Sequence, residues 1–514
     1  MTIRPIRFFH RGAVVEVADA ATTRTVLDWL REDARCTGTK EGCNEGDCGA
    51  CTVVIGEVAA PGDPAAVRGL SLRTVNACIQ FLPTLDGKAL FTVEDLKAIA
   101  PATGATKDVR HALHPVQQAM VDCHGSQCGF CTPGFVMSLW CAYEHGRACD
   151  RVPTRQQLAD ELSGNLCRCT GYRPILDAGQ RMFDLPAATL DTAPVLAALK
   201  QIGASDDTFG YRAAGATFHA PKSLDEFAAL REANPTAQLL AGSTDIGLWV
   251  NKQFRPLPDI LYIGDVAELK QIRDERGELT IGAGASLEAA WAALAQRWPA
   301  LTDVWLRFAS PPIRNAGTMG GNIANGSPIG DSAPVLMALD AQVELRKGAR
   351  VRRMALPEFY VDYMKNRLEA GEFVQAIVVP ALPPGRQLRG YKISKRFDCD
   401  ISALCAGFAI ELDGDVVTAV RLAYGGMAAV VKRAAAAEAA LVDQPWTQAA
   451  VNAAKAALAD DFKPLTDMRA SAAYRLQVAG NLLQRFWLET RRENPLPIEA
   501  TSVWSVMPHM TAAA

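Results

Sequence analysis

The arrangement of the cysteines constrains this chain more than any other feature of its sequence. Eight of the fourteen cysteines lie in two closely spaced sets, and both sets fall in the first third of the 514 residues. The first set comprises Cys43, Cys48, Cys51 and Cys78. The second set comprises Cys128, Cys131, Cys167 and Cys169. Such groups of thiols predict two metal sites ahead of a long remainder.

The first set reads Cys-x4-Cys-x2-Cys with a distant fourth cysteine, which is the plant-type ferredoxin spacing for a [2Fe–2S] cluster. The stretch from Glu41 to Cys51 contains three glycines, which allow positive φ angles and let backbone N–H groups point toward the cluster. A zinc knuckle or a disulfide staple is the alternative, but zinc sites favour paired Cys-x2-4-Cys hooks. The spacing therefore favours iron, with these four cysteines as its ligands.

The second set is weaker evidence when it is read alone. Cys128-x2-Cys131 precedes a helix start with Pro133 near its first turn, and Cys167-x-Cys169 lies in a loop before another helix. A zinc ribbon also uses two cysteine hooks, normally with x2 in both and a shorter gap between them. The spacing favours two irons without excluding zinc. The other six cysteines show no ligand pattern and are expected to be ordinary buried residues: Cys36, Cys123, Cys141, Cys149, Cys399 and Cys405.

Composition excludes several classes of protein. The net charge of −3 and the pI near 6.2 give no electrostatic support for binding nucleic acid or a charged membrane. No apolar run approaches the ~20 residues of a membrane-spanning helix. A content of 49% hydrophobic residues supplies several cores, and the length predicts about three or four domains. Many reduced thiols without a signal peptide favour a cytoplasmic protein.

Hydrophobic periodicity changes along the chain. Strands are predicted at 6–9, 51–55, 238–242, 260–263, 279–282, 406–410 and 418–423. Helices are predicted over 25–33, 116–123, 133–145, 154–162, 174–183, 434–441 and 447–458. Loop composition at 186–194 predicts a linker.

Two loops rich in small residues lie in the middle of the chain. Leu239–Ile246 is a buried strand that runs into a turn, and the second loop extends from Thr318 to Asp331. Several backbone N–H groups in such loops can bind a pyrophosphate, although plain surface turns have the same composition. The stretch Gly282–Leu287 imitates the dinucleotide-binding fingerprint but has leucine where the third glycine belongs, so we reject a Rossmann fold.

In their order and sequence, these parts resemble the iron–sulfur/FAD small subunits of the bacterial xanthine dehydrogenase family, which are molybdenum hydroxylases. The resemblance covers nearly the whole chain and rests on three motifs: Gly42–Cys51, Gln127–Gly134 and Gly164–Pro174. It makes the second cysteine set ligands of a second [2Fe–2S] cluster. It implies a multidomain α+β fold with a β-grasp ferredoxin-like domain (1–85), a helical [2Fe–2S] domain (86–185), a linker (186–205), a two-part α/β FAD-binding domain (206–387), a C-terminal α+β domain (388–505) and a tail (506–514).

The same resemblance implies which residues contact FAD. The first loop would supply Leu239, Leu240, Ala241, Gly242, Ser243, Thr244, Asp245 and Ile246. The second loop would supply Thr318, Met319, Gly320, Gly321 and Asn322. Phe308 would lie near the flavin, and Asp331 would close the loop through hydrogen bonds. Val374 would be an apolar flavin contact and Lys392 a basic one, whereas outside the family Phe308 would be core and Lys392 a solvated charge.

Two features depart from the family pattern. The stretch between Cys51 and Cys78 is longer than usual through a loop at 59–66, which is tolerable because closure entropy grows slowly with loop length. Ser243 stands where glycine or asparagine is common in the FAD turn, which affects only the local geometry.

The resemblance implies an electron-transfer subunit of xanthine dehydrogenase, active in purine catabolism. A partner chain holding the molybdenum cofactor would oxidise hypoxanthine or xanthine, and electrons would pass through both clusters to FAD and on to NAD⁺. FAD accepts single electrons and releases two together, so no side chain here need act as a catalytic acid or base. The molybdenum cofactor is expected in the partner because the residues after 505 are too few to enclose it. A dimer of heterodimers is expected.

Two alternatives remain. The chain could serve another molybdenum hydroxylase, acting on an aldehyde, CO or an N-heterocycle, although those enzymes commonly carry the iron–sulfur and flavin parts on separate chains. It could instead be a non-catalytic iron–sulfur redox sensor, but a sensor has no need of the FAD loops.

Overall fold

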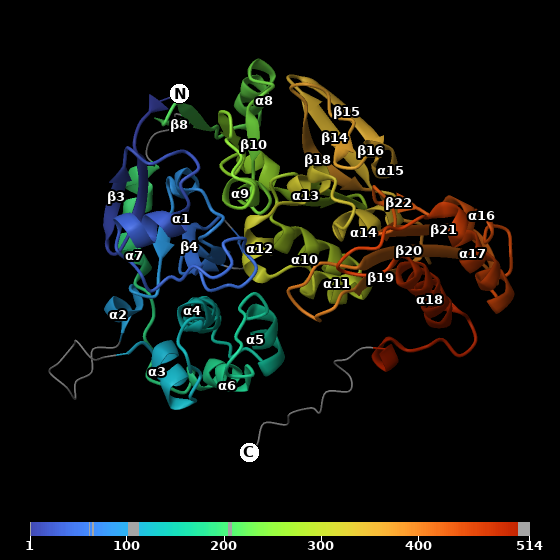
Figure 1. The fold of residues 1–514 in the computed structure, drawn as a ribbon, viewed down its shortest axis with the longest axis horizontal. Helices are drawn as coiled ribbons and strands as arrows, with labels where there is room; N and C mark the ends of the chain where they lie inside the picture. Colours follow the sequence, from blue (N-terminus) through green and yellow to red (C-terminus); the bar gives the residue numbers. More distant parts are fainter. Residues whose placement is uncertain (1, 61, 64–65, 101–112, 204–207, 502–514) are drawn as a thin grey trace.

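The computed structural model describes residues 2–60, 62–63, 66–100, 113–203 and 208–501. Figure 1 shows the N-terminal sheet and the helices α3–α6 on the left, a central region of two sheets, and an α+β domain on the right. The predicted multidomain α+β class is confirmed. The expected tail at 506–514 lies outside the described residues, as do three positions of the predicted loop at 59–66.

The N-terminal domain is a six-stranded mixed sheet in the order β3-β2-β7-β4-β6-β5. Its strands are β2 (Ile6–His10), β3 (Ala13–Val17), β4 (Thr52–Val58), β5 (Ala66–Val67), β6 (Leu70–Asn76) and β7 (Ala89–Phe91). The helix predicted over 25–33 forms as α1 (Val26–Asp28) and a π-helical turn (Trp29–Asp33), capped by the Thr25 side chain. The glycine-rich loop lies between this helix and β4, so buried elements fix both of its ends.

Helices form the second domain: α3 (Pro115–Asp122), α4 (Thr132–Ala148), α5 (Arg155–Glu161) and α6 (Arg173–Arg181), with the short α2 (Leu96–Ile99) before them. The predicted helices are confirmed to within a few residues. Helix α4 is enclosed, because Phe135, Trp140 and Tyr143 are fully buried. Cys131 directly precedes α4, and Cys169 lies four residues before α6 begins at Arg173.

The resemblance made 186–205 a linker, and composition predicted one at 186–194, but the described part of this segment is largely helical. Helix α7 (Thr192–Ile202) occupies much of this segment and begins with the Asp191 side chain as its N-cap. Val195, Leu199 and Ile202, spaced four and three residues apart, are buried in the core shared with the first two domains.

The central region contains two sheets. The first has the order β1-β8-β9-β11-β10, with β1 (Thr2–Ile3), β8 (Phe209–Ala213), β9 (Ala216–Ala220), β10 (Gln238–Leu240) and β11 (Ile260–Tyr262). Helices α8 (Leu224–Ala233) and α9 (Ile246–Asn251) accompany this sheet. Strand β1 pairs in parallel with β8, so the start of the chain joins this sheet and not the N-terminal domain.

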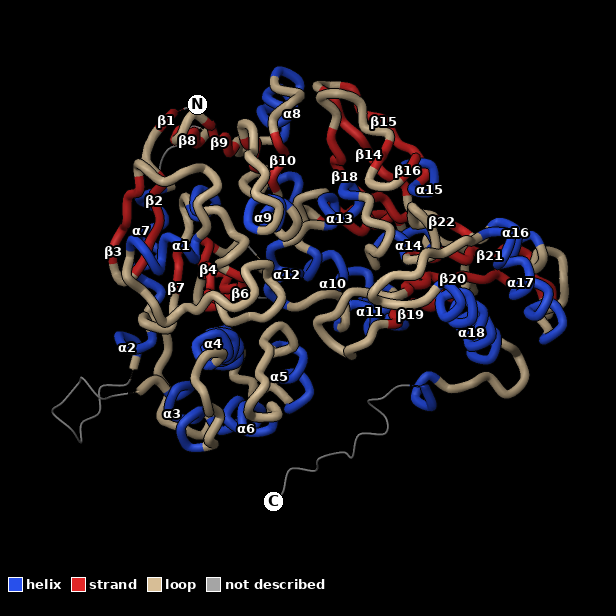
Figure 2. The backbone as a smooth tube through the Cα atoms, viewed as in Figure 1, coloured by secondary structure: helices blue, strands red, loops and turns tan. Residues whose placement is uncertain are grey.

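The second central sheet is antiparallel, in the order β12-β13-β18-β14-β15. Its strands are β12 (Ile272–Glu275), β13 (Glu278–Gly282), β14 (Gln342–Lys347), β15 (Arg350–Ala355) and β18 (Phe373–Val379), and a hairpin follows with β16 (Tyr360–Asp362) and β17 (Lys365–Asn366). The helices are α10 (Leu287–Arg297), α11 (Thr302–Leu306), α12 (Pro311–Ala316), α13 (Met319–Asn325), α14 (Ser332–Ala338) and α15 (Leu356–Phe359). In Figure 2, α9 lies below β10 and α13 lies below β18, and residues of all four elements line one pocket.

The C-terminal domain is a four-stranded antiparallel sheet, β19 (Gln387–Ile393), β20 (Leu404–Asp413), β21 (Val416–Gly425) and β22 (Lys432–Arg433), with α16 (Ala435–Ala439), α17 (Gln448–Asp461) and α18 (Ala472–Thr490). A Cβ on Gly407 would lie 2.4 Å from the carbonyl oxygen of Pro334, so glycine there lets α14 pack directly on β20. This contact ties the domain to the central region. No helix among the described residues is long and apolar enough to cross a membrane.

Candidate functional site

The first predicted cysteine set converges in the structure. The Cys43 thiol accepts hydrogen bonds from the thiols of Cys48 and Cys78, which holds the pKa of Cys43 well below its ordinary value. Cys78 donates to Cys43 and also to Cys51, which raises the pKa of Cys78. The backbone N–H groups of Asp47 and Cys48 each lie 3.3 Å from Cys43 Sγ. Converging thiols with N–H donors on the sulfur fit the needs of an anionic [2Fe–2S] cluster.

The loop that carries this set depends on glycine at one close contact. Gly49 has a φ of +71°, and a Cβ there would lie 2.2 Å from the carbonyl oxygen of Gly164. From the other side, a Cβ on Gly134 would lie 2.1 Å from the carbonyl oxygen of Gly49. Glycine therefore allows the first cysteine loop to touch both segments that carry the second set.

The second set forms two thiol pairs, Cys128 with Cys169 and Cys131 with Cys167. Burial, with a hydrogen bond to Cys167, raises the pKa of Cys131 to about 12. The Thr170 hydroxyl and N–H donate to Cys167 Sγ at 3.2 and 3.4 Å. Cys128 and Cys169 are exposed, so this set reaches the surface.

Among the described residues, no group of three or more His, Cys, Asp or Glu side chains is arranged to hold a single metal ion. A [2Fe–2S] group makes a different demand, because it takes two thiolates on each of two irons. The paired thiols of the second set and the linked thiols of the first suit that demand.

The sequence predicted that the other six cysteines are buried, but two of them are not. Cys36, Cys141, Cys399 and Cys405 are buried, but Cys123 is half-buried and Cys149 is exposed. Cys149 follows the last residue of α4, where the helix runs out of the core.

Backbone hydrogen bonds join the two cysteine sets. The N–H of Leu166, the residue before Cys167, donates to the carbonyl oxygen of Cys48 at 3.0 Å. The Asn165 side chain donates to the carbonyl oxygen of Gly49 at 3.1 Å and accepts from the Ser138 hydroxyl at 2.7 Å. Asn165 lies inside the motif Gly164–Pro174, but no sequence pattern predicted a role for it.

The other side of the first set contacts the central region. The Asn251 side chain, at the end of α9, donates to Asn44 Oδ1 at 3.1 Å and to the carbonyl oxygen of Cys78 at 2.7 Å. Lys252 Nζ donates to the carbonyl oxygen of Cys43 at 2.5 Å. Helix α9 begins at Ile246, where the first of the two loops rich in small residues, 239–246, ends. The first cysteine set therefore lies between the second set and that loop.

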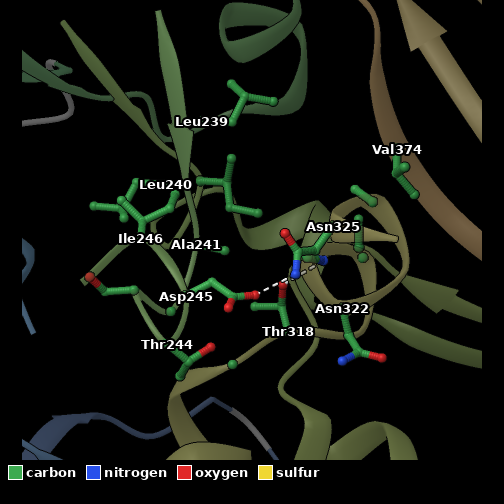
Figure 3. A pocket seen from close by; sticks show the side chains of 18 of the residues that line it. Leu239, Leu240, Ala241, Thr244, Asp245, Ile246, Thr318, Asn322, Asn325 and Val374 are labelled. Carbon is green, nitrogen blue, oxygen red and sulfur yellow. Dashed lines mark hydrogen bonds between the residues drawn. The ribbon is translucent and has the colours of Figure 1, made fainter. Parts of the chain in front are cut away.

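A cavity of about 710 Å³ opens in the central region, and both predicted loops line it (Figure 3). This volume suits a cofactor or nucleotide. The predicted contacts that line it are Leu239, Leu240, Ala241, Gly242, Ser243, Thr244, Asp245, Ile246, Thr318, Gly320, Gly321, Asn322 and Val374. Figure 3 shows Asn325 of α13 hydrogen-bonded to Asp245, which joins the two loops.

Three successive N–H groups of the first loop are free to donate, whereas those at the start of helix α13, in the second loop, are engaged. The N–H groups of Gly242, Ser243 and Thr244 have no acceptor among the described residues. In the second loop, the N–H groups of Met319, Gly320 and Gly321 already donate to Ala285, Ala283 and Thr318, respectively. An anionic group in the cavity would therefore meet free N–H groups from the first loop.

Ser243 fits such a ligand. Its buried hydroxyl lines the cavity and has no hydrogen-bond partner among the described residues. Its φ of +63° lies in the left-handed region, which explains why glycine or asparagine is common there.

Part of the cavity wall comes from residues that no sequence motif predicted. Trp249, Gln253 and Arg255 follow the first loop, and Tyr363 and Met364 come from the turn between β16 and β17. The Arg255 guanidinium lies 4.4 Å from the centre of the Trp249 ring, a cation–π contact.

Four predicted FAD contacts lie outside the cavity wall: Phe308, Met319, Asp331 and Lys392. Phe308 packs in the core, with its ring 5.7 Å from that of Trp291. Lys392 is not a solvated charge, because its ammonium group is 2.7 Å from Asp331 Oδ2 and the two side chains are 2% and 7% exposed. The other Asp331 oxygen, Oδ1, has no partner among the described residues.

Removing Asp331 would leave the Lys392 ammonium group buried without a partner. We expect Asp331→Ala to lower the free energy of unfolding in urea by about 3–5 kcal/mol. Asp362→Ala is the matched control, since it removes an exposed pair with Lys365 at 3.6 Å and should cost less than about 1 kcal/mol. Equal losses in the two variants would contradict the importance of the buried pair.

Four family models match successive parts of the chain. Residues 8–81 match a 2Fe-2S iron-sulfur cluster binding domain, and residues 101–180 match a [2Fe-2S] binding domain. Residues 211–382 match the FAD binding domain in molybdopterin dehydrogenase, and residues 389–490 match the CO dehydrogenase flavoprotein C-terminal domain. Together with the fold, these matches define an iron–sulfur flavoprotein that transfers electrons.

Comparison with individual proteins gives the family. The chain is 31% identical to the xanthine dehydrogenase of Drosophila subobscura, over 85% of this chain and 35% of that protein. It is 26% identical to aldehyde oxidase 4 of Cavia porcellus, over 94% of this chain and 39% of that protein. The structure of the carbon monoxide dehydrogenase of Hydrogenophaga pseudoflava matches with a TM-score of 0.50 and 30% identity, over 52% of this chain and 94% of that one.

The chain belongs to the molybdenum hydroxylase family, as one of its iron–sulfur/FAD subunits. It spans 35% and 39% of the length of the two curated relatives named above.

Proposed function

We propose that this chain is the electron-transfer subunit of a cytoplasmic xanthine dehydrogenase, paired with a chain that holds the molybdenum cofactor, in a dimer of heterodimers. The partner oxidises hypoxanthine or xanthine. The electrons enter this chain at the second cysteine set, pass to the first set and reach FAD, and NAD⁺ is the final acceptor. The 31% identity to a xanthine dehydrogenase supports this choice of substrate.

The spatial order of the second cysteine set, the first cysteine set and the cavity is the main support for the proposal. A backbone hydrogen bond of 3.0 Å from Leu166 to Cys48 joins the two cysteine sets. Asn251 and Lys252 then join the first set to the helix that follows the first cavity loop. Hydrogen bonds among the described residues therefore link the exposed second set, through the first, to the helix that follows the first cavity loop.

The residues of the chain would have the following roles in binding the clusters and FAD. When bound, the two clusters carry single electrons and FAD pairs them for transfer as hydride. The eight cysteines hold the irons, and the N–H groups of Asp47, Cys48 and Thr170 stabilise charge on the sulfurs. The free N–H groups of the first loop and the Ser243 hydroxyl would bind the anionic diphosphate of FAD, and Phe308 and Lys392 would support its ring system from outside the cavity wall.

The partner would dock beside the second cysteine set. Cys128 and Cys169 are exposed, and Phe130 and Tyr172 beside them are 48% and 39% exposed. Aromatic residues that stay exposed around a redox site are typical of an interface that excludes water on docking. A permanent complex of this kind buries more than about 2,000 Å².

A second candidate is the same electron-transfer role in another molybdenum hydroxylase. The match to an aldehyde oxidase and the structural match to a carbon monoxide dehydrogenase favour it. The substrate of the co-purified partner separates the two candidates.

Co-expression with the matching molybdenum chain should give a stable complex that converts xanthine to urate and reduces NAD⁺. Phe130→Asp should weaken the complex at least about tenfold, because it places a charge in the docking face. Val416→Asp is the control, since Val416 is 41% exposed on the C-terminal domain, and it should leave assembly unchanged. Urate production by this chain alone, free of any molybdenum protein, would contradict the proposal.

A further inference from the structure

The loop between β19 and β20, residues 394–403, reaches from the C-terminal domain to the first cysteine loop. The Arg307 guanidinium holds its base by donating to the carbonyl oxygens of Lys392 and Phe397 at 2.9 and 3.1 Å. Farther along, Cys399 Sγ lies 3.4 Å from the carbonyl oxygen of Asp47. The C-terminal domain thus places a thiol against the loop that carries Cys43 and Cys48.

This contact is fixed from several directions. Cys399 is 6% exposed, and its φ of +49° is a conformation that costs a non-glycine residue energy. Arg396 donates to the carbonyl oxygen of Cys399 at 2.5 Å and lies 3.8 Å from the Asp47 carboxylate. That carboxylate is a second acceptor for the thiol, with Oδ1 at 3.6 Å from Sγ. Burial raises the pKa of Cys399 to about 12, so the thiol keeps its proton and can donate.

The acceptor belongs to the peptide group that joins Asp47 to Cys48. The N–H of that same peptide donates to Cys43 Sγ at 3.3 Å. The C=O and N–H of a planar trans peptide are part of one conjugated group and point in opposite directions. A donor on the oxygen therefore polarises the group and strengthens the hydrogen bond that its N–H makes to the sulfur. One peptide group separates the Cys399 thiol from Cys43.

We propose that Cys399 is a positioning residue that raises the reduction potential of the first cluster by orienting and polarising the Asp47–Cys48 peptide. Hydrogen bonds to the sulfurs are among the features that set the potential of an iron–sulfur cluster, because they stabilise the added negative charge of the reduced form. The inference rests on the proposed function, which makes Cys43 a ligand of that cluster. It gives the C-terminal domain a direct effect on electron transfer.

The second cluster is an internal reference, because Cys399 touches the first loop and the hydrogen bonds to Cys167 come from Thr170. Cys405 offers a matched control. It is also a buried cysteine of the same domain, and its thiol donates to a backbone carbonyl oxygen, that of Asp331, at 3.7 Å. Replacing either cysteine by alanine therefore removes a buried thiol, but only Cys399→Ala removes the contact with Asp47.

The test is a redox titration of the full chain, loaded with iron, sulfide and FAD and followed by electron paramagnetic resonance. Cys399→Ala should move the midpoint of the first signal to a more negative potential. The oxidised-to-reduced ratio should change at least about threefold, or about 28 mV at 59 mV per tenfold for one electron. The second signal should not move. Cys399→Ser, which keeps a donor, should restore the midpoint, and Cys405→Ala should shift neither signal.

An unchanged first midpoint in folded Cys399→Ala protein would overturn the inference, and so would an equal shift or loss of both signals. Loss of the first signal alone, with the second intact and with Cys399→Ser retaining both, would support the positioning role. Absence of the first signal from the unaltered chain would instead overturn the proposed function, and this inference with it.

Discussion

Gly242→Ala is expected to abolish stable FAD binding. A Cβ at Gly242 would lie 1.8 Å from the carbonyl oxygen of Ala316 and 2.2 Å from its carbonyl carbon. These are backbone atoms at the end of α12, so they cannot move aside as a flexible side chain could. The added methyl group must push the first cavity loop away from the segment that leads to Thr318, and both loops line the cavity.

The affinity for FAD should fall at least ~100-fold, or about 2.7 kcal/mol, measured as flavin retained per chain after gel filtration. Gly480→Ala is the matched control. Gly480 lies in helix α18, and the atoms nearest its Cβ would be those of the flexible Lys455 side chain, at 3.4 Å or more; alanine is also a better helix former than glycine. Both cluster signals should persist in both variants, which reports that the rest of the chain is folded. Full flavin content in Gly242→Ala would contradict the placement of FAD in this cavity.

Single cysteine replacements should remove one cluster each. Cys43 is the centre of the first set, because it accepts hydrogen bonds from two other thiols and two backbone N–H groups. Cys43→Ser should eliminate the first signal in electron paramagnetic resonance of dithionite-reduced protein, and Cys128→Ser should eliminate the second. The two sets share no cysteine. The hydrogen bond from Leu166 to Cys48 that joins them involves backbone atoms and no thiol, so each cluster should assemble without the other.

Cys149→Ser serves as the control, because this cysteine is exposed and belongs to neither set. It should retain both signals. Loss of both signals from either single ligand replacement, in protein that is still folded, would show that the two sets do not form independent sites.

Elements with local signals were predictable from the sequence. Helices α3 and α5 of the second domain begin at side-chain caps, with His114 and Thr154 each forming a capping box. Prolines near the starts of α3, α4 and α6 mark their first turns. These signals lie within a few residues of the elements that they start.

Elements fixed by distant contacts were missed. Strand β1 has two residues and exists because Thr2 and Ile3 pair with Phe209 and Gly210, more than 200 positions away. Helix α7 was hidden because the proline and alanine before it have loop composition, and its apolar face is explained only by the core that it joins. Propensity is a weak guide where tertiary packing decides.

The residues of the candidate site also divide into those with a local sequence signal and those that only the fold brings together. Small residues and glycines revealed the two cavity loops, because a close backbone approach needs them. Trp249, Arg255 and Tyr363 line the same cavity without any motif, since only the fold brings them there. Cys399 was predicted to be an ordinary buried residue, and it is buried, but its contact with Asp47 joins positions 352 residues apart.

The order of electron transfer is tested most directly with NADH as the reductant and the Cys43→Ser chain as the probe. Under anaerobic conditions, NADH should reduce both clusters of the unaltered FAD-loaded chain, because electrons entering at the flavin reach the second cluster through the first. In Cys43→Ser, dithionite should still reduce the second cluster, whereas NADH should leave it oxidised on the same time scale. Reduction of the second cluster by NADH at the unaltered rate in Cys43→Ser would contradict the route proposed for this chain.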